Sequence, residues 1–352
     1  MIPLIFHSYL PAALLDIFIF VAHHTGLLAL LRRASLVKND TVSQTVRLEY
    51  PECFIDTTTI QLVSPPQGHA NPSYAILSHR WGQEEIDGCE DFASEETKKK
   101  IGYQKILKAC DQARIDGYKY LWADTCCISK DPAKRSRDIQ SMFAFYKNAA
   151  VCYVHLFDVG DEEYCCGGKA DSSQDLSRSK DCTLYNIQYF HHSCNLDPYH
   201  ICLSDWFRRG WTLQELIAPK DVRFYGKTWN FIGTKSNMQK VLSDRTSIPC
   251  DILTGNKALS GTSRLDRITW SMGRMTTKPA DQAYCLMGIL DIFIEPKNGE
   301  SVERASKRLS NSFYYTTVET GVEGVYEVFQ ISAKHTALRR AILGRLASGH
   351  GE

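Results

Sequence analysis

The sequence lacks the short motifs that mark the common nucleotide, hydrolase and zinc-protease sites. It has no G-x-G-x-x-G after its first expected strand and no G-x-x-x-x-G-K-[ST] loop, so neither phosphate-binding loop is present. It also has no G-x-S-x-G turn for a nucleophilic serine and no H-E-x-x-H zinc helix. These absences exclude a Rossmann dinucleotide fingerprint, a P-loop NTPase, an α/β-hydrolase and a zincin protease.

The chain also has almost no net charge. Its 41 Lys and Arg residues balance 40 Asp and Glu residues, which gives +1, and no basic stripe is interleaved with aromatic residues. The chain therefore has no overall field that attracts nucleic acid or an anionic membrane. We expect no nucleic-acid partner.

The cysteines are numerous but do not form a recognisable framework. There are 13 of them, an odd number, and they include the adjacent pairs Cys126–Cys127 and Cys165–Cys166. Scattered thiols of this kind suit no simple set of disulfides and are typical of small core residues in a reducing compartment. We therefore expect a cytoplasmic protein.

The first 31 residues are strongly apolar, and the chain after them divides into regions. Prolines, histidines and Asp16 interrupt the apolar stretch, so we expect a packed leader, with a membrane anchor or an uncleaved signal as the alternative. A proline-rich linker then precedes a folded unit. The expected regions are a leader and linker at 1–69, a folded unit at 70–235 with an insertion at 158–203, a helical extension at 236–315, and a tail at 316–352.

Apolar runs alternate with helical patterns in the folded unit. The runs at 74–79, 118–125, 150–157 and 221–226 have the length of strands. Helical spacing separates them, and a capping Asp131 before Pro132 marks one helix start. This alternation predicts βαβ units. We therefore predict an α/β fold with a flavodoxin-like parallel sheet flanked by helices, followed by a mostly helical C-terminal extension.

Polar and aromatic residues follow the first two expected strands. His79, Arg80 and Trp81 come after the first strand, and Asp124 ends the second. Doubly wound sheets place site residues at these carboxyl ends. Arg80 and Trp81 can flank a planar ligand or cover the sheet edge. Asp124 can serve a site or only bond local backbone N–H groups.

One carboxylate, Glu215, lies in the aromatic stretch "WFRRGWTLQELI" at 206–217. A single helix through this stretch places Phe207, Trp211 and Glu215 on one face. A carboxyl beside aromatic walls is partly desolvated, so its pKa tends upward. The alternative is a boundary glutamate paired with Arg208 or Arg209.

The insertion holds soft metal ligands. Zinc modules usually offer C-x(2–4)-C pairs, and the insertion has none. We therefore expect incidental cysteines rather than a metal site, with zinc as the alternative. The residues concerned are Cys165, Cys166, Cys182, His191, His192, Cys194, His200 and Cys202.

Three blocks together resemble the fungal heterokaryon-incompatibility (HET) domain family. "YAILSHRWG" at 74–82 is similar to Y-x-x-L-S-x-x-W-G. "YLWADTCCISK", followed by "IQSMFAFYKNAAVCYVHL", is similar to W-x-D-x-x-C-I with its helix and strand. "WFRRGWTLQELIAP" is similar to W-x-x-R-x-W-x-x-Q-E. A fourth block, "SMGRMTTKPADQAYCLMGILDI", resembles the segment downstream of the domain in one large subgroup, so the likeness covers about residues 70–292.

HET domains are thought to be related to TIR domains, so the resemblance implies a TIR-like sheet. In NAD-cleaving TIR domains a glutamate on a later helix is catalytic, and Glu215 is the matching residue here. The resemblance thus implies NAD as a substrate, with no cofactor and no metal. Aromatic walls would stack on the base, and Arg80 would meet a phosphate oxygen. The ligand-binding candidates are Ser78, His79, Arg80, Trp81, Asp124 and Trp211.

The function implied by the resemblance is fungal nonself recognition. Such a module, active in heterokaryon or vegetative incompatibility, triggers regulated cell death, with NAD hydrolysis as its chemical step. The alternative is a non-catalytic domain that acts by self-association through Trp- and Arg-rich surfaces. The sequence has no sensor repeats, so we expect self-association or a separate sensor protein as the partner, and membrane contact only through residues 1–31.

Overall fold

The computed structural model describes residues 47–317, apart from 66–70, 83, 87, 89–91, 93 and 161–199, and apart from the side chains of 313–317. The apolar leader, the body of the insertion and the C-terminal tail therefore lie outside the described residues. Among the described helices, none has the length and apolar character that crossing a bilayer requires.

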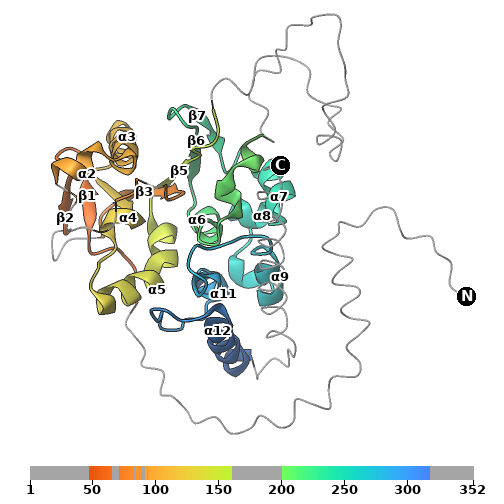
Figure 1. Ribbon diagram of the computed structural model, residues 1–352. Helices are drawn as coiled ribbons and strands as arrows, with labels where there is room; N and C mark the ends of the chain where they lie inside the picture. The colour runs from red at the N-terminus through yellow and green to blue at the C-terminus, as the bar shows by residue number, and fades with distance from the viewer. Residues whose placement is uncertain are drawn as a thin grey trace, which may run out of the picture. The chain divides into compact units, whose positions relative to one another are not determined.

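A seven-stranded sheet forms the centre of the fold (Figure 1). Its order is β2-β1-β4-β3-β5-β6-β7. The inner strands β3 (Tyr74–His79), β4 (Tyr120–Ala123), β5 (Val151–His155) and β6 (Val222–Tyr225) all run parallel. Numbered along the chain among themselves, they lie in the order 2-1-3-4, the flavodoxin-like arrangement. The predicted α/β class and its parallel sheet are confirmed.

Antiparallel strands extend the sheet at both edges. β1 (Phe54–Asp56) pairs with β2 (Gln61–Val63) and with β4. At the other edge, β7 (Phe231–Thr234) pairs with β6 through an irregularity in register. β1 and β2 lie within the segment for which the sequence suggested only a leader and linker, because strands of three residues leave no recognisable apolar run.

Helices cover both faces of the inner strands. α3 (Ile101–Ile115) packs on β3 and β4 from one side, and α6 (Thr212–Ile217) packs on β3 and on α5 (Pro132–Asn148). On the α5 side, the Tyr74 hydroxyl donates to the Phe145 carbonyl at 2.5 Å, and Trp122 packs edge-on against the ring of Tyr146. Every residue of β3 and β5 is therefore buried, as parallel strands covered on both faces require.

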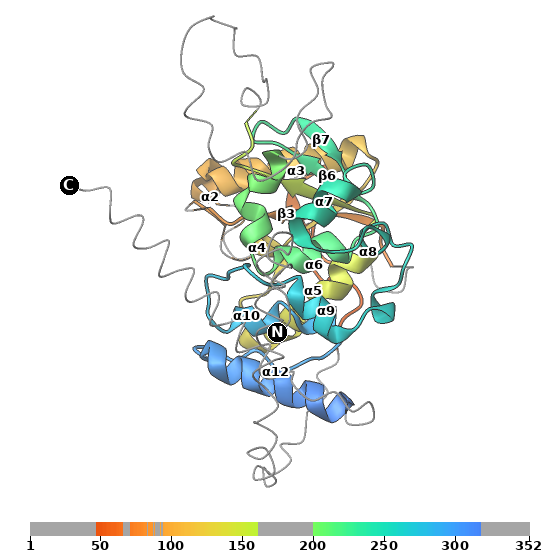
Figure 2. The same ribbon diagram turned by 90° about the vertical axis from the view of Figure 1, so that its right-hand side faces the viewer.

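Beyond β7 the described chain is mostly helical, as predicted. α7 (Gln239–Thr246), α8 (Cys250–Leu253) and α9 (Arg264–Thr269) precede α10 (Asp281–Tyr284), α11 (Met287–Leu290) and α12 (Val302–Thr317). α12 packs on α10 (Figure 2), and α11 packs on α5. The extension is therefore joined to the helical layer of the sheet through α5.

We expect a Gly288→Ala substitution to separate α11 from α5. A Cβ atom at position 288 would collide with the Phe143 side chain close to its own backbone attachment, where it cannot yield. Overpacking of this kind costs about 1–3 kcal/mol of unfolding free energy, more than the gain in helix propensity offsets. Urea unfolding should show this loss, whereas Gly261→Ala, which has only an ordinary contact to Lys257, should not. Equal stability of the two variants would contradict the described α5–α11 packing.

Candidate functional site

The alternation of β3 divides the predicted site between the two faces of the sheet. Ser78 and His79 are its last two residues, so their side chains point to opposite faces. β4 runs parallel beside it and ends at Ala123, immediately before Asp124. The carboxyl ends of these strands therefore bring the candidates to one edge, with Ser78 on the α5–α6 side and His79 on the α3 side.

On the first side, Ser78 contacts Glu215 directly. The Ser78 hydroxyl donates to Glu215 Oε2 at 2.5 Å, and it accepts a hydrogen bond from the Trp206 indole N–H at 2.8 Å. Because the indole can only donate, the serine proton is directed to the carboxyl. Glu215 is 3% exposed. The sequence placed Ser78 and Glu215 in the site but did not reveal Trp206 as the group that orients the serine.

The stretch around Glu215 is not the single helix that the sequence suggested. η5 (Asp205–Arg208) is a short 3-10 turn capped by Ser204, and α6 begins only at Thr212. Gly210 lies in the break, where an added Cβ would sit 2.6 Å from Thr276 Cγ2. The expected common face of Phe207, Trp211 and Glu215 is therefore wrong, because helical spacing does not continue across the break.

Burial controls the protonation of Glu215. It raises the pKa of this carboxyl to about 8, and repulsion from Asp124 adds to the effect. The Ser78 hydrogen bond, Arg209 and the Tyr146 hydroxyl act in the opposite direction without reversing the shift. The predicted upward shift is confirmed, and its largest cause is burial, without the expected aromatic stripe along one helix. A pKa of about 8 keeps most of the Glu215 carboxyl protonated at pH 7.

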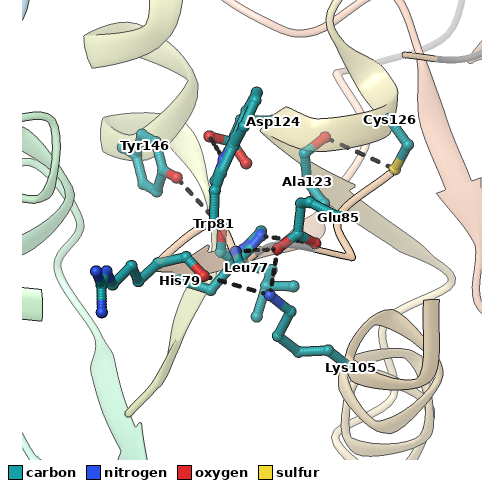
Figure 3. A network of polar contacts seen from close by, with 11 residues as sticks. Leu77, His79, Trp81, Glu85, Lys105, Ala123, Asp124, Cys126 and Tyr146 are labelled. Atoms are coloured by element: carbon teal, nitrogen blue, oxygen red, sulfur yellow. Dashed lines mark hydrogen bonds and ion pairs between the residues drawn. The ribbon is translucent and has the colours of Figure 1, made fainter. Parts of the chain in front are cut away.

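On the opposite side, His79 joins a buried cluster with Glu85 and Lys105 (Figure 3). Lys105 Nζ lies 2.7 Å from Glu85 Oε2, and His79 Nε2 lies 3.6 Å from Glu85 Oε1. Burial alone would raise the pKa of Glu85, but His79 and Lys105 together lower it to about 2. The sequence pattern did not indicate Glu85 or Lys105 as site residues. The one signal for this cluster was a lysine beside the apolar face of α3.

Asp124 and Trp81 form a pair at the same edge (Figure 3). The Trp81 indole N–H donates to Asp124 Oδ2 at 2.9 Å, while Asp124 Oδ1 is inaccessible to solvent and has no hydrogen-bond partner. Burial raises the pKa of Asp124, against the opposing effects of His79 and of the indole N–H. Asp124 begins the short helix α4 (Asp124–Cys127), so the predicted strand over 118–125 ends earlier than expected.

The two remaining candidates have partners elsewhere. Arg80 donates to Asp205 Oδ2 at 2.8 Å, and its guanidinium carbon lies 5.2 Å from the centroid of the Phe157 ring. The Trp211 indole donates to Asp281 Oδ2 at 3.0 Å. Both side chains are thus engaged outside the contact between Ser78 and Glu215.

A segment from the helical extension holds the start of α6. The backbone N–H of Met275 donates to Arg208 O at 2.6 Å, and that of Gly210 donates to Met275 O at 2.9 Å. Arg274, which is buried, donates to Arg209 O and to Thr212 Oγ1, each at 3.0 Å. Burial lowers the pKa of Arg274 to about 10. This clamp, residues 274–275, fixes the helix that carries Glu215.

The described residues hold no group of three or more His, Cys, Asp or Glu side chains arranged for a metal ion. Of the soft ligands in the insertion, six lie outside those residues, at positions 165, 166, 182, 191, 192 and 194. Of the other two, Cys202 is a buried thiol 3.8 Å from Val241 O, and His200 begins the short turn η4 (His200–Leu203). Neither of these two residues belongs to a metal cluster among the described side chains.

The raised pKa of Glu215 predicts a specific pH dependence of stability. Between the ordinary value of 4.5 and about 8, the unfolded chain loses this proton while the folded chain keeps it. The free energy of unfolding then falls by about 1.4 kcal/mol per pH unit from this group alone. Glu215→Gln removes the titration, so the difference between wild type and variant should change with that slope in urea unfolding at pH 5–8. A constant difference would show an unshifted carboxyl.

The clamp predicts a local effect of Arg274→Gln on α6. Hydrogen bonds from a charged donor contribute about 1.5–3 kcal/mol, so their loss should speed exchange of the α6 amides about tenfold or more. Arg267→Gln is the matched control, since Arg267 is also buried and bonds the carbonyls of Thr262 and Ile289 instead. Hydrogen exchange should separate the two variants. If the α6 amides exchange equally faster in both variants, the substitutions destabilise the protein generally and residues 274–275 do not clamp α6.

Comparisons with known proteins identify a family whose match begins at β3 and ends at Glu215. Residues 74–215, from the first residue of β3 to Glu215, match the family described as "Heterokaryon incompatibility protein (HET)". The "Vegetative incompatibility protein HET-E-1" of Podospora anserina is 38% identical over 240 residues. That alignment covers 68% of this chain, which spans 16% of the relative's length. No solved structure matches the chain. Residues 74–215 therefore form a HET domain, and the chain belongs to the HET domain family.

Proposed function

We propose that this chain is a vegetative-incompatibility module that responds to nonself and triggers regulated cell death. The observation that carries the proposal is the HET match over residues 74–215. The relative that is 38% identical is named a vegetative incompatibility protein. Because the chain spans 16% of that relative, the proposal concerns the activity of the HET domain and leaves aside the rest of the relative.

The proposed chemical step is hydrolysis of NAD at the bond between nicotinamide and ribose. The C–N bond breaks, and its electron pair neutralises the pyridinium nitrogen. Neutral nicotinamide therefore leaves without a general acid, unlike the alcohol released from an ordinary glycoside. Water then adds to the ribose carbon and loses a proton, which gives ADP-ribose. The remaining requirement is a negative group beside the oxocarbenium-like ribose, in a site of low dielectric.

Glu215 is the carboxyl that best meets this requirement. It is buried at the carboxyl end of β3, where Ser78 fixes one of its oxygens. Its raised pKa means that the reactive carboxylate becomes abundant only near pH 8. A cationic substrate placed beside it would favour the deprotonated form. We therefore propose a TIR-like NAD hydrolase whose rate rises with pH towards 8.

Self-association is the partner proposal that accompanies this activity. α3 exposes two large apolar side chains, Ile101 at 68% and Ile115 at 77%. They lie at the two ends of the helix, about 21 Å apart at 1.5 Å per residue, so they form no continuous patch, and the proposal rests on the likeness to TIR domains. A second copy of the chain or a separate sensor protein would then bring HET domains together. If the domain has no catalytic activity, such contacts are its remaining mode of action.

We expect the full chain, clustered on beads through an affinity tag, to convert NAD to nicotinamide and ADP-ribose. Glu215→Gln should lower the rate about 100-fold or more, the usual effect of removing a group that stabilises transition-state charge. Glu300→Gln is the matched control, since its carboxyl is also buried but bonds Tyr284 and Arg308, and it should keep the wild-type rate. Chromatography of the products measures all three.

The same variants should separate catalysis from contact in cells. Expression of the wild type and Glu300→Gln in a fungal host should arrest growth, and Glu215→Gln should not. Arrest by Glu215→Gln with no NAD loss would contradict the hydrolase proposal and favour action by association. Absence of arrest in every case, with folded protein present, would contradict the proposed role in cell death.

A further inference from the structure

Trp81 differs from the buried tryptophans of the described fold because its ring is accessible. It is 37% exposed, whereas Trp122, Trp206 and Trp270 are each exposed by 4% or less. Its indole N–H is nevertheless fixed, since it donates to Asp124 Oδ2 at 2.9 Å (Figure 3). An accessible aromatic face that is held in one orientation is suited to stacking on a planar group.

The Asp124 carboxyl has no cation in direct contact: His79 and Lys105 lower its pKa by electrostatic attraction, but both are paired with Glu85. Asp124 forms no ion pair with any described side chain, and its Oδ1 has no hydrogen-bond partner. Lys105 is engaged by Glu85 and by the carbonyl of Arg80. Repulsion between Asp124 and Glu215 also contributes to the raised pKa of Glu215. Two carboxyl groups thus act on the same edge of the sheet.

Buried polar atoms without partners gather beside Asp124. The His79 side chain is fully buried, yet neither of its ring nitrogens has a hydrogen-bond partner. Glu85 Oε1 also lacks a hydrogen bond, but it lies 3.6 Å from His79 Nε2, so His79 Nδ1 and Asp124 Oδ1 are the atoms left without a polar contact. His79 is close enough to both Asp124 and Glu85 to lower the pKa of each carboxyl. Unsatisfied buried groups cost free energy and often mark functional positions, so His79 Nδ1 and Asp124 Oδ1 are consistent with a ligand at this edge.

We infer that Trp81 and Asp124 form a subsite for a planar cationic ring, the class to which the pyridinium of NAD belongs. The inference rests on the proposed function and names the part of the substrate that this edge holds. A cation within about 6 Å of an indole centroid is attracted by the electron-rich face. A carboxylate that accepts the indole N–H pushes electron density into the ring, which strengthens that attraction.

Exposure of the indole ring, rather than the Trp–Asp contact alone, distinguishes this pair. Trp211 and Asp281 make the same hydrogen bond at 3.0 Å. Three basic side chains, those of Lys278, Arg135 and Arg209, act on the Asp281 carboxyl and oppose the effect of its burial. His79 and Lys105 act on Asp124 in the same way, so the two pairs differ in exposure: the Trp81 ring is 37% exposed, whereas Trp211 is partly buried and packs against the core. The subsite is therefore placed at Trp81, and Trp211 is left as part of the support for α6.

The test uses 1-methylnicotinamide, a cationic pyridinium with no ribosyl bond to cleave, and neutral nicotinamide as the uncharged comparison. Ligand-observed NMR titration of the full chain measures both affinities. We expect the wild type to bind the cationic ring about tenfold more tightly or better. Asp124→Asn keeps an acceptor for the indole but removes the charge, and should lose that preference. Trp81→Ala should weaken binding about tenfold or more, and Trp81→Phe should weaken it less.

Asp138→Asn is the matched control, because Asp138 is another buried carboxyl with a pKa raised by burial, bonded to the Ser129 N–H. It should bind as the wild type does. Equal affinity for the two probes, no binding of the cationic probe, or full retention in Asp124→Asn would each overturn the inference. If Asp124→Asn fails to fold, the exposed Trp81 variants decide. If the chain binds 1-methylnicotinamide but does not cleave NAD, only the hydrolase proposal is contradicted. If it cleaves NAD but binds 1-methylnicotinamide and nicotinamide equally, only the subsite is contradicted.

Discussion

The hydrogen bond between Ser78 and Glu215 is the contact on which this arrangement depends. It joins the penultimate residue of β3 to a helix residue 137 positions later in the chain, and it lies in the buried layer between the sheet and the helices. A buried carboxyl is costly unless its charge is removed or paired. Here the proton remains on Glu215 and the Ser78 donor, oriented by Trp206, satisfies one oxygen. The family match ends at this same residue.

The two faces of the sheet at the end of β3 shift the pKa of a buried glutamate in opposite directions. Glu215 has a raised pKa because its burial and the repulsion from Asp124 outweigh the attraction of Arg209. Glu85 is also largely buried, but Lys105 and His79 hold it as a carboxylate and lower its pKa. One strand, through its alternation, thus separates a protonated acid from an ion pair. The proposed chemistry depends on this contrast, because the charge of Glu85 is already paired with Lys105 and His79, whereas Glu215 forms no ion pair with a described side chain.

The sequence predicted the parts of the fold that depend on local pattern. Four apolar runs and their intervening helices were enough for the parallel sheet, and family resemblance identified Ser78 and Glu215. The sequence pattern did not predict the break before α6, where the contacts come from Arg274 and Met275, some 65 positions away. Lys105 and Glu85 were missed for the same reason, since their pairing depends on how α3 docks on β3. Long-range contacts of this kind leave little trace in residue spacing.

In this structure, Glu215 is a buried acid whose raised pKa keeps it mostly protonated at neutral pH. Carbon-13 NMR of the glutamate side-chain carboxyls of the full chain measures this protonation, with the Glu215 signal assigned by its absence in Glu215→Gln. We expect a titration midpoint near pH 8 for this signal. A midpoint near the ordinary value of 4.5 would contradict it, because the carboxyl would then be ionised and solvated, and neither its burial nor its contact with Ser78 would control its charge.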